Sequence, residues 1–192
     1  MSDNQIDFSE RQTKVDVDPI FVERWSPRAF QQHVIDEATL TRIMEAARWS
    51  PSCFNAQPWR LYTSTKATFD EYLNLLVEGN QAWAKDTSVI GFMVAERHFE
   101  HNGKPNAYAE FDCGAAWMAL TLQARKEGLY THGMGGILKP EVADYLKLDP
   151  AQHEVVMGFT IGKLADLSNL SDEKRSQEVP NSRKSLDDIW FK

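Results

Sequence analysis

Apolar residues recur at helical spacing in two stretches of the first half of the chain. Over residues 36–48, behind a suitable N-cap at Asp36, they occupy one helical face at Leu40, Ile43, Met44 and Ala47. Over residues 66–78, with Gly79 beyond the end, they do so again at Phe69, Tyr72, Leu73 and Leu76. Both stretches are therefore predicted to be helices that bury one side.

A longer helix is predicted over residues 107–127, and Gly128 ends it. Its apolar residues lie on all sides, which predicts that it is buried on all sides, either inside the domain or against a partner subunit. Pro140 suits the first turn of a shorter helix that reaches about Leu148.

Three stretches have the length and composition of strands, namely residues 59–63, 88–96 and 154–162. The run 88–96 is almost continuously apolar, as in a central strand that is buried on both faces. Segment 131–137 has three glycines within four positions, so it cannot continue a helix.

Both ends of the chain are polar and carry only scattered apolar residues. The last of these are Ile189, Trp190 and Phe191. We therefore expect a single domain over residues 1–192, with an N-terminal arm over about 1–20 and a C-terminal arm over about 164–192. Such arms are expected to wrap a partner subunit.

Charge and composition narrow the class of protein. The 192 residues are 42% hydrophobic and 26% charged, and their net charge is −7, which argues against bulk attraction to nucleic-acid phosphates. Any anionic ligand must then be met by a few local cations. With two cysteines, no apolar run of about 20 residues and no apolar stretch suited to a signal peptide, a soluble, cytoplasmic protein is expected, without a membrane or nucleic-acid partner.

Arg24, Ser26 and Arg28 form the first candidate site. Two guanidinium groups and a hydroxyl within five residues suit a phosphate, because arginine's planar fork matches the phosphate oxygens. The alternative is a solvated pair of surface arginines.

The loop over residues 50–59 is the second candidate. Ser52, Asn55 and Gln57 offer uncharged donors and acceptors for the edge of a heteroaromatic ring, while Pro51 and Pro58 restrict the backbone. The alternative is a well-capped turn. Within the same loop, Cys53 is either a reactive thiol or a packing residue.

The glycines of segment 133–136 are the third candidate, because they leave backbone N–H groups open to a ligand. A turn that needs positive φ is the alternative. The dinucleotide fingerprint GxGxxG, a P-loop and a G-x-S-x-G elbow are absent from the sequence. A metal site is not expected, since no second motif completes a ligand set with His98, His101, Asp112 and Cys113.

Taken together and in this order, these stretches resemble the FMN-dependent nitroreductase family. The resemblance extends over residues 20–190 and is carried by RWSPRAF (24–30), ARWSPSCFNAQPWRLY (47–62), FDCGAAWMALTLQARKEGLY (111–130), GMGGI (133–137), FTIGKL (159–164) and PNSRKSLDDI (180–189). It implies an α+β fold with a central, mostly antiparallel sheet flanked by helices, in an intertwined homodimer with FMN at the interface.

The resemblance also implies roles for individual residues. Arg24 and Ser26 would hold the FMN phosphate with Arg183, Arg28 would lie near the N1/O2 edge of the ring, and Gly135 and Gly136 would offer N–H groups near N5. The partner subunit would contribute Pro51, Ser52, Cys53 and Asn55. The other expected cofactor-binding residues are Trp25, Gln57, Asn80, Met134 and Lys184. Lys184 follows Arg183 where a second arginine is common, so either of the two is a candidate for the phosphate.

The implied reaction is a ping-pong transfer of hydride from NADH or NADPH through flavin N5 to an electron-poor acceptor such as a nitroaromatic or quinone. Because the flavin does the chemistry, no catalytic side chain is expected. Gly135 replaces an acidic residue of some members and leaves more room over the flavin. Three alternatives stay open: a flavin-binding carrier or sensor without turnover, a dehalogenating or flavin-modifying member of the family, and an acidic interaction module.

Overall fold

The fold is centred on a five-stranded sheet. The computed structural model describes residues 6–192, the side chains at positions 169, 172 and 174 excepted. The sheet consists of β1 (Phe30–Gln31), β2 (Trp59–Thr63), β3 (Val89–Glu96), β4 (Tyr130–Met134) and β5 (His153–Leu164). β5 pairs with β1, β3 and β4, and β2 pairs with β3. All these pairings are antiparallel.

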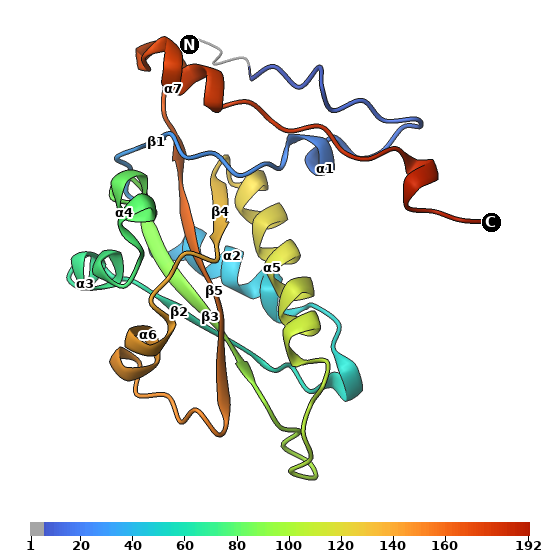
Figure 1. The fold of residues 1–192 in the computed structure, drawn as a ribbon, viewed down its shortest axis with the longest axis vertical. Coiled ribbons are helices and arrows are strands. Elements are labelled where there is room, and N and C mark those ends of the chain that lie inside the picture. The colour runs from blue at the N-terminus through green and yellow to red at the C-terminus, as the bar shows by residue number, and fades with distance from the viewer. Residues whose placement is uncertain (1–5) are drawn as a thin grey trace.

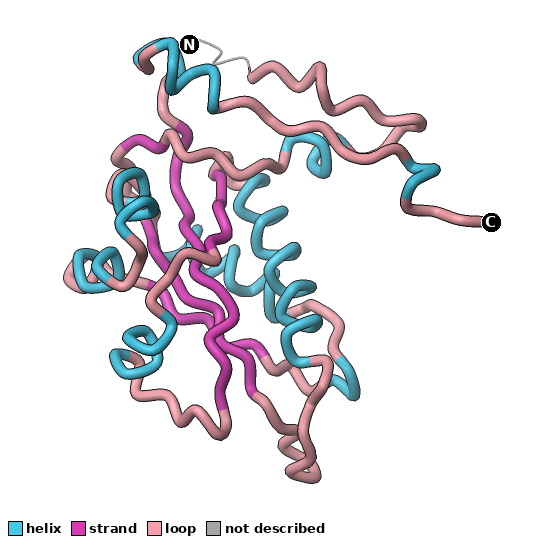
Figure 2. Tube along the Cα trace, in the orientation of Figure 1, coloured by secondary structure: helices cyan, strands magenta, loops and turns pink. Residues whose placement is uncertain are grey.

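Helices cover both faces of the sheet, as Figures 1 and 2 show. α2 (Glu37–Arg48) and the long α5 (Ala109–Lys126) lie on one face. α3 (Phe69–Asn74), α4 (Glu78–Ala84) and α6 (Lys139–Tyr145) pack on the other. The predicted α+β class with a mostly antiparallel sheet between helices is therefore confirmed.

β3 is the buried centre of the fold, as its sequence predicts. Val89 and Met93 belong to the apolar core beneath α2 and α5, whereas Ile90 and Phe92 belong to the core beneath α3, α4 and α6. Successive side chains of a strand point to opposite faces, so a strand covered on both sides must be apolar throughout.

The predicted helix over residues 66–78 is two helices, so that prediction is wrong in its extent. Leu76 forms an isolated bridge with Ile137, and the N–H of Val77 donates to the carbonyl of Gly136. These long-range bonds end α3 and let α4 begin, and Gly79 lies inside α4 rather than beyond a helix end. The apolar periodicity continues through the break because Leu76 is buried, although it lies between the two helices and not within one continuous helix.

The other helices begin and end close to their predicted positions. Asp36 caps α2 by accepting from the N–H of Thr39 at 2.7 Å, as its side chain suggests. α6 has Pro140 in its first turn but ends at Tyr145, before the predicted Leu148. Neither β4 nor the five-residue α1 (Pro19–Glu23) is predicted by the sequence.

The N-terminal segment from residue 6 to α1 and the C-terminal segment after α7 run side by side, away from the sheet (Figure 1). After β5 the chain forms η2 (Leu167–Asn169), α7 (Asp172–Gln177) and η3 (Leu186–Asp188). Lys14 forms an ion pair with Asp187, and Arg11 donates to the carbonyl of Asn181. None of the helices in the described part of the chain has the length and apolar content that a membrane crossing requires.

Candidate functional site

The segment after α1 presents Arg24 and Ser26 on one face. Trp25 between them is buried against Tyr130 at the start of β4, with the two rings edge to face. In extended backbone, side chains alternate between the two sides, so an inward Trp25 turns its neighbours outward together. The Arg24 guanidinium lies 3.4 Å from the Ser26 hydroxyl oxygen. Pro27 keeps Ser26 extended, because the residue before a proline is restricted to that region.

Three separate elements fix the backbone of this segment. Arg11, in the N-terminal arm, donates from one guanidinium nitrogen to the carbonyls of both Val22 and Arg24, at 2.7 Å each. Further on, the ring Nδ1 of His132, on β4, lies 2.8 Å from the Pro27 carbonyl. From the C-terminal extension, the buried Glu178 carboxylate accepts from the N–H of Arg28, with both oxygens at 3.0 Å.

Arg11, Arg24 and Arg183 form a cationic cluster at the base of the arms. Burial lowers the pKa of Arg11 to about 10, helped by the charges of Arg183 and Arg24. Burial and the charge of Arg183 also lower the pKa of Arg24. Within the described residues, none of the three forms an ion pair with a carboxylate. Arg11 and Arg24 are partly buried and Arg183 is exposed. Because no carboxylate among the described residues neutralises this cluster, a phosphate group would be a favourable counter-ion for it.

Arg11 and Arg183 also line a cavity of about 490 Å³ between the N-terminal arm and α1. Phe21 and Val22 contribute apolar walls to it. Arg11 and Arg183 are thus accessible from one side.

Close approach of other side chains, not backbone conformation, requires a glycine at Gly133 and at Gly136. Gly133, Gly135 and Gly136 all lack positive φ, which contradicts the alternative of a positive-φ turn. A side chain at Gly136 would lie 2.7 Å from the amide nitrogen of Asn80, which itself donates to the Gly136 carbonyl at 2.8 Å. Gly135 is exposed and meets nothing within 4 Å, so the protein leaves open space above that peptide.

The loop over residues 50–57 is held in a strained conformation. Phe54, Asn55 and Gln57 have φ of 51°, 55° and 48°, a region that costs non-glycine residues energy. The hydroxyl of Ser52 accepts from the N–H of Gln57, so the loop does contain the capped turn that the sequence allowed. Asp112, near the start of α5, accepts from the N–H of Cys53 at 3.0 Å. Strain that is stabilised in this way is typical of functional loops.

Within one chain, this loop and the cationic cluster lie at opposite ends of α5. Asp112 contacts the loop, whereas Arg125, near the other end of the helix, lies 3.5 Å from Glu23 beside Arg24. Thirteen residues of α-helix separate the two contacts by roughly 20 Å. The structure therefore brings Arg24, Ser26, Arg28 and Arg183 to one region. It places Asn80 against Gly136, which follows Gly135, and it leaves Pro51, Ser52, Cys53, Asn55 and Gln57 at the other end of α5.

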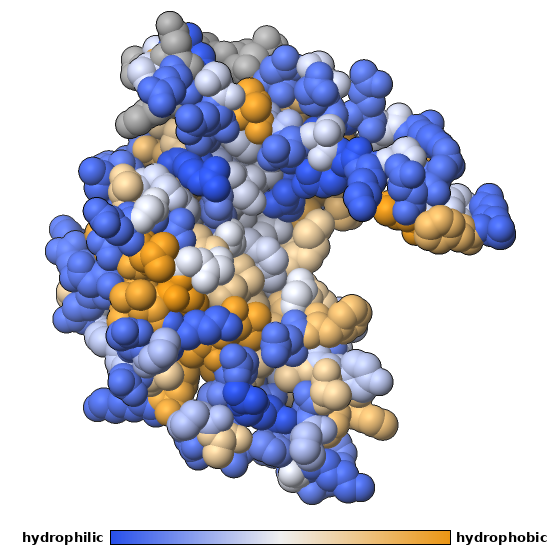
Figure 3. Space-filling view, viewed as in Figure 1, coloured by the Kyte–Doolittle hydropathy of each residue, from blue (hydrophilic) through white to orange (hydrophobic). Residues whose placement is uncertain are grey.

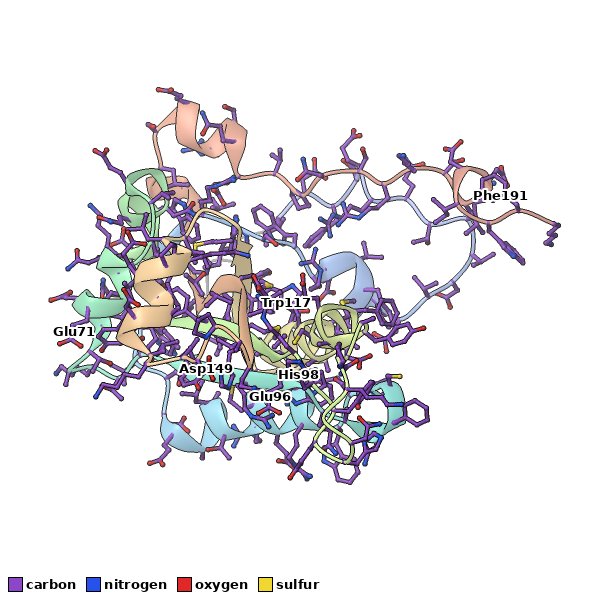
Figure 4. All side chains as sticks on the ribbon, turned by 60° about the horizontal axis from the view of Figure 1, so that its bottom comes forward. Glu71, Glu96, His98, Trp117, Asp149 and Phe191 are labelled. Atoms are coloured by element: carbon purple, nitrogen blue, oxygen red, sulfur yellow. The ribbon has the colours of Figure 1, made fainter. Side chains whose placement is uncertain are left out.

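One side of α5 is not covered by any of the described residues. Phe111 is 79% exposed and Met118 38%, and Gly114 between them is also exposed. The molecule is hollowed between the arms and the body on the side of α5 (Figure 3). Phe191 lies at the far end of the C-terminal arm, well away from Trp117 on α5 (Figure 4). The apolar end of that arm is left exposed to the outside.

No metal ligands gather in the described residues, since no three His, Cys, Asp or Glu side chains come close enough to share an ion. Cys113 is fully buried. Burial is the largest of the causes that raise the pKa of its thiol to about 12, and the charges of Asp112 and Glu110 raise this pKa as well. Cys53 is partly exposed. Any thiol chemistry would therefore have to come from Cys53.

A model of the nitroreductase family matches residues 21–87 and 70–163. The chain belongs to the nitroreductase family. These matches include the segment 24–28, the loop 50–57 and the glycines 133–136, and they confirm the family that the motifs resemble.

Similar proteins agree with this assignment. A solved structure described as an oxidoreductase containing FMN is 41% identical, covers 94% of this chain and 93% of its own, and has a TM-score of 0.88. A nitroreductase-type protein from Exiguobacterium sibiricum, solved in complex with FMN, shares the fold at 23% identity, with a TM-score of 0.74 over 94% of this chain and 99% of its own.

Two curated relatives carry activity-based names. A Streptomyces coelicolor protein, named for a proposed NADH dehydrogenase/NAD(P)H nitroreductase activity, is 26% identical over 73% of this chain and 55% of its own length. YdgI of Bacillus subtilis, named for a proposed NAD(P)H nitroreductase activity, is 28% identical over 69% of this chain and 80% of its own.

The structure places the remaining predicted residues as follows. Trp25 and Met134 are buried in the core. Arg28 and Lys184 are exposed. Sequence reasoning missed Arg11, Glu178, His132 and Asp112, all of which fix backbone atoms of the candidate segments. No local motif marks them, because their partners lie far away in the sequence.

His132 gives the stability of this protein a predictable pH dependence. Burial lowers the pKa of its ring below the ordinary 6.5, and the charges of Arg28 and Arg24 lower it further, against the opposing bonds to Pro27 and Ser26. The unfolded chain therefore binds the proton first as the pH falls, and the free energy of unfolding decreases below about pH 6.5. Urea unfolding at about pH 7.5 and about pH 5.5 measures this loss. His132→Asn, which keeps a donor toward Pro27, is expected to weaken the dependence, and an unchanged slope would contradict the assignment.

Proposed function

We propose that the protein is an FMN-dependent NAD(P)H oxidoreductase of nitroreductase type that reduces electron-poor small molecules, such as nitroaromatics or quinones. The observation that carries the proposal is the cationic cluster of Arg11, Arg24 and Arg183, which has no carboxylate partner in the described chain. Support comes from the 41% identical oxidoreductase that contains FMN.

The residues present fit FMN. Its phosphate would take the Arg24 guanidinium and the Ser26 hydroxyl, which already lie on one face. Arg183 would complete the set, and we assign it in preference to Lys184 because its charge is the one that lowers the pKa of Arg24. The exposed peptide of Gly135 leaves room for the ring to approach the backbone.

A bound FMN would supply the redox chemistry, accepting hydride from NADH or NADPH and passing reducing equivalents to the acceptor. The protein would position that ring and stabilise its charge. Arg28 would place a cation near the ring edge that becomes negative on reduction, while Glu178 and His132 fix the backbone of Arg28 and Pro27. Asn80 would hold the Gly136 peptide in place. No side chain of this site needs to transfer a proton.

The active unit is proposed to be a homodimer. A two-fold symmetric pair would bring the loop 50–57 of one chain to the cationic cluster of the other, which a single α5 keeps roughly 20 Å apart. The same pairing would cover the exposed face of α5 at Phe111 and Met118. The N-terminal and C-terminal arms would then wrap the second copy. The cytoplasmic location stays a prediction from the sequence.

Cys53 is expected to line the cofactor pocket without a redox role. Cys53→Ser replaces the thiol by a hydroxyl of similar size and keeps the backbone N–H that Asp112 accepts. Reduction of bound flavin by NADH or NADPH should therefore stay largely intact in this variant, as stopped-flow absorbance would show. Complete loss of reduction with FMN still bound would contradict this role.

Steady-state kinetics of the FMN-loaded protein test the proposed function. Initial rates are measured with NADH and then NADPH, at several fixed concentrations of a nitroaromatic or a quinone. Ping-pong transfer predicts parallel double-reciprocal lines, because donor and acceptor never occupy the site together. The absence of acceptor-dependent oxidation of either donor, with FMN bound, would overturn the proposal.

A further inference from the structure

Arg11 is the one member of the cationic cluster whose guanidinium already has protein acceptors in three places. It donates to the carbonyls of Val22 and Arg24 through one nitrogen and to the carbonyl of Asn181 through another, at 2.7, 2.7 and 3.0 Å. Val22 and Arg24 flank the phosphate-binding face, and Asn181 lies two positions before Arg183. One side chain thus joins the N-terminal arm, the segment 24–26 and the C-terminal arm.

The C-terminal arm has a second attachment to the same region. Glu178 accepts from the N–H of Arg28 with both carboxylate oxygens. Arg11 and Glu178 therefore fasten the stretch that precedes Arg183 on either side of the segment 24–28. Arg183 itself donates only to the nearby carbonyls of Asn181 and Ser182 within the described chain, so its position depends on where that stretch is docked.

Docking this arm brings Arg183 close to two other cations. Repulsion among the three opposes docking, because each guanidinium stays charged at neutral pH. A phosphate bound among the three guanidinium groups attracts each of them, so the electrostatic contribution then favours docking. Whatever favours the docked arm must then favour phosphate, and phosphate must favour docking to the same degree.

We propose that Arg11 is a positioning residue that docks the C-terminal arm onto the phosphate-binding segment, so that arm docking and binding of the FMN phosphate stabilise each other. The inference rests on the proposed function, since it needs FMN as the ligand. Arg11 acts through its planar fork, not through direct contact with the phosphate.

Arg11→Lys separates this role from a purely electrostatic one. Lysine keeps the charge, but its single amine cannot replace the two guanidinium nitrogens through which Arg11 reaches three carbonyls. FMN and riboflavin, which lacks the phosphate, are titrated into the wild-type and variant apoproteins by flavin fluorescence. The FMN dissociation constant should rise about tenfold in the variant, the scale of lost hydrogen bonds, while riboflavin binding stays unchanged. Arg97→Lys is the matched control, since Arg97 donates to the His153 carbonyl at the opposite end of the sheet.

Hydrogen exchange over residues 178–192 supplies a readout that a change in affinity alone does not give. In the wild type, FMN should slow exchange in this arm more than riboflavin does. In Arg11→Lys this difference should shrink, even at flavin concentrations that saturate the protein.

Each other outcome has a definite meaning. An FMN to riboflavin preference that Arg11→Lys leaves unchanged overturns the inference and leaves the proposed function intact. Equal weakening of FMN and riboflavin also overturns it, because Arg11 would then support the fold in general. Failure of the wild type to bind FMN would instead remove the proposed function on which the inference rests.

Discussion

Arg24→Ala is expected to weaken FMN binding by about 1.5–3 kcal/mol, which is roughly 10- to 150-fold in the dissociation constant. Arg24 is half-buried, lies 3.4 Å from the Ser26 hydroxyl, and belongs to a cluster that no carboxylate neutralises among the described residues. A phosphate in this position would accept charge-assisted hydrogen bonds, which are the strong ones. Equilibrium titration with FMN measures the effect.

Riboflavin binding and folding stability separate this role from a general structural one. Riboflavin affinity should not change in Arg24→Ala, because the lost partner is the phosphate. The free energy of unfolding of the apoprotein should stay within about 1 kcal/mol of the wild type, since the substitution also removes one of three repelling cations. Unchanged FMN affinity, or an equal loss for both flavins, would count against the phosphate assignment.

Met118→Asp is expected to convert a dimer into a monomer that binds no FMN. Met118 lies on the exposed face of α5 with Phe111 and Gly114. A carboxylate there is expected to destabilise an interface on this face but not the fold of one chain. Burying an unpaired charge between subunits costs several kcal/mol, enough to prevent association at ordinary protein concentrations. Sedimentation velocity reports the assembly state, and circular dichroism reports the fold.

Met118→Leu is the matched control, because it keeps an apolar side chain of nearly the same volume. This variant should remain dimeric and should bind FMN like the wild type. A Met118→Asp protein that stays dimeric and holds FMN would show that this face of α5 is not the interface. The loop 50–57 would then need another route to the cofactor.

The sequence predicts best those features that depend on nearby residues. Asp36 caps a helix three residues away, and the apolar run 88–96 specifies a strand that is buried on both faces. The candidate segment 24–28 is recognisable because its side-chain types carry the chemistry. These interactions need no knowledge of the rest of the fold.

Features that depend on distant partners are the ones that the sequence misses. Leu76 ends a helix because it pairs with Ile137, and β4 forms because β5 offers it an edge, although Gly133 disfavours a strand. Glu178 reaches the N–H of Arg28 across 150 positions, and Arg11 reaches Asn181 across 170. Side chains that support a site by binding its backbone leave no local pattern.

The strained loop 50–57 shows both cases in one place. Its donors and acceptors mark it as a candidate site in the sequence. Three non-glycine residues with positive φ, and the carboxylate of Asp112 that holds the N–H of Cys53, become visible only in the structure. The length of α5 separates this loop from the cationic cluster of the same chain. That separation is the geometric reason to expect that a second subunit brings the two together.

The most direct test of the central claim is the visible absorbance spectrum of the purified protein, recorded before and after anaerobic addition of NADH or NADPH. An FMN-dependent oxidoreductase is expected to show flavin bands that bleach within seconds, with the faster donor identifying the preferred nicotinamide. Bands that persist would indicate a flavin-binding protein without nicotinamide turnover. A spectrum without flavin bands, even after FMN has been supplied, would contradict the account as a whole.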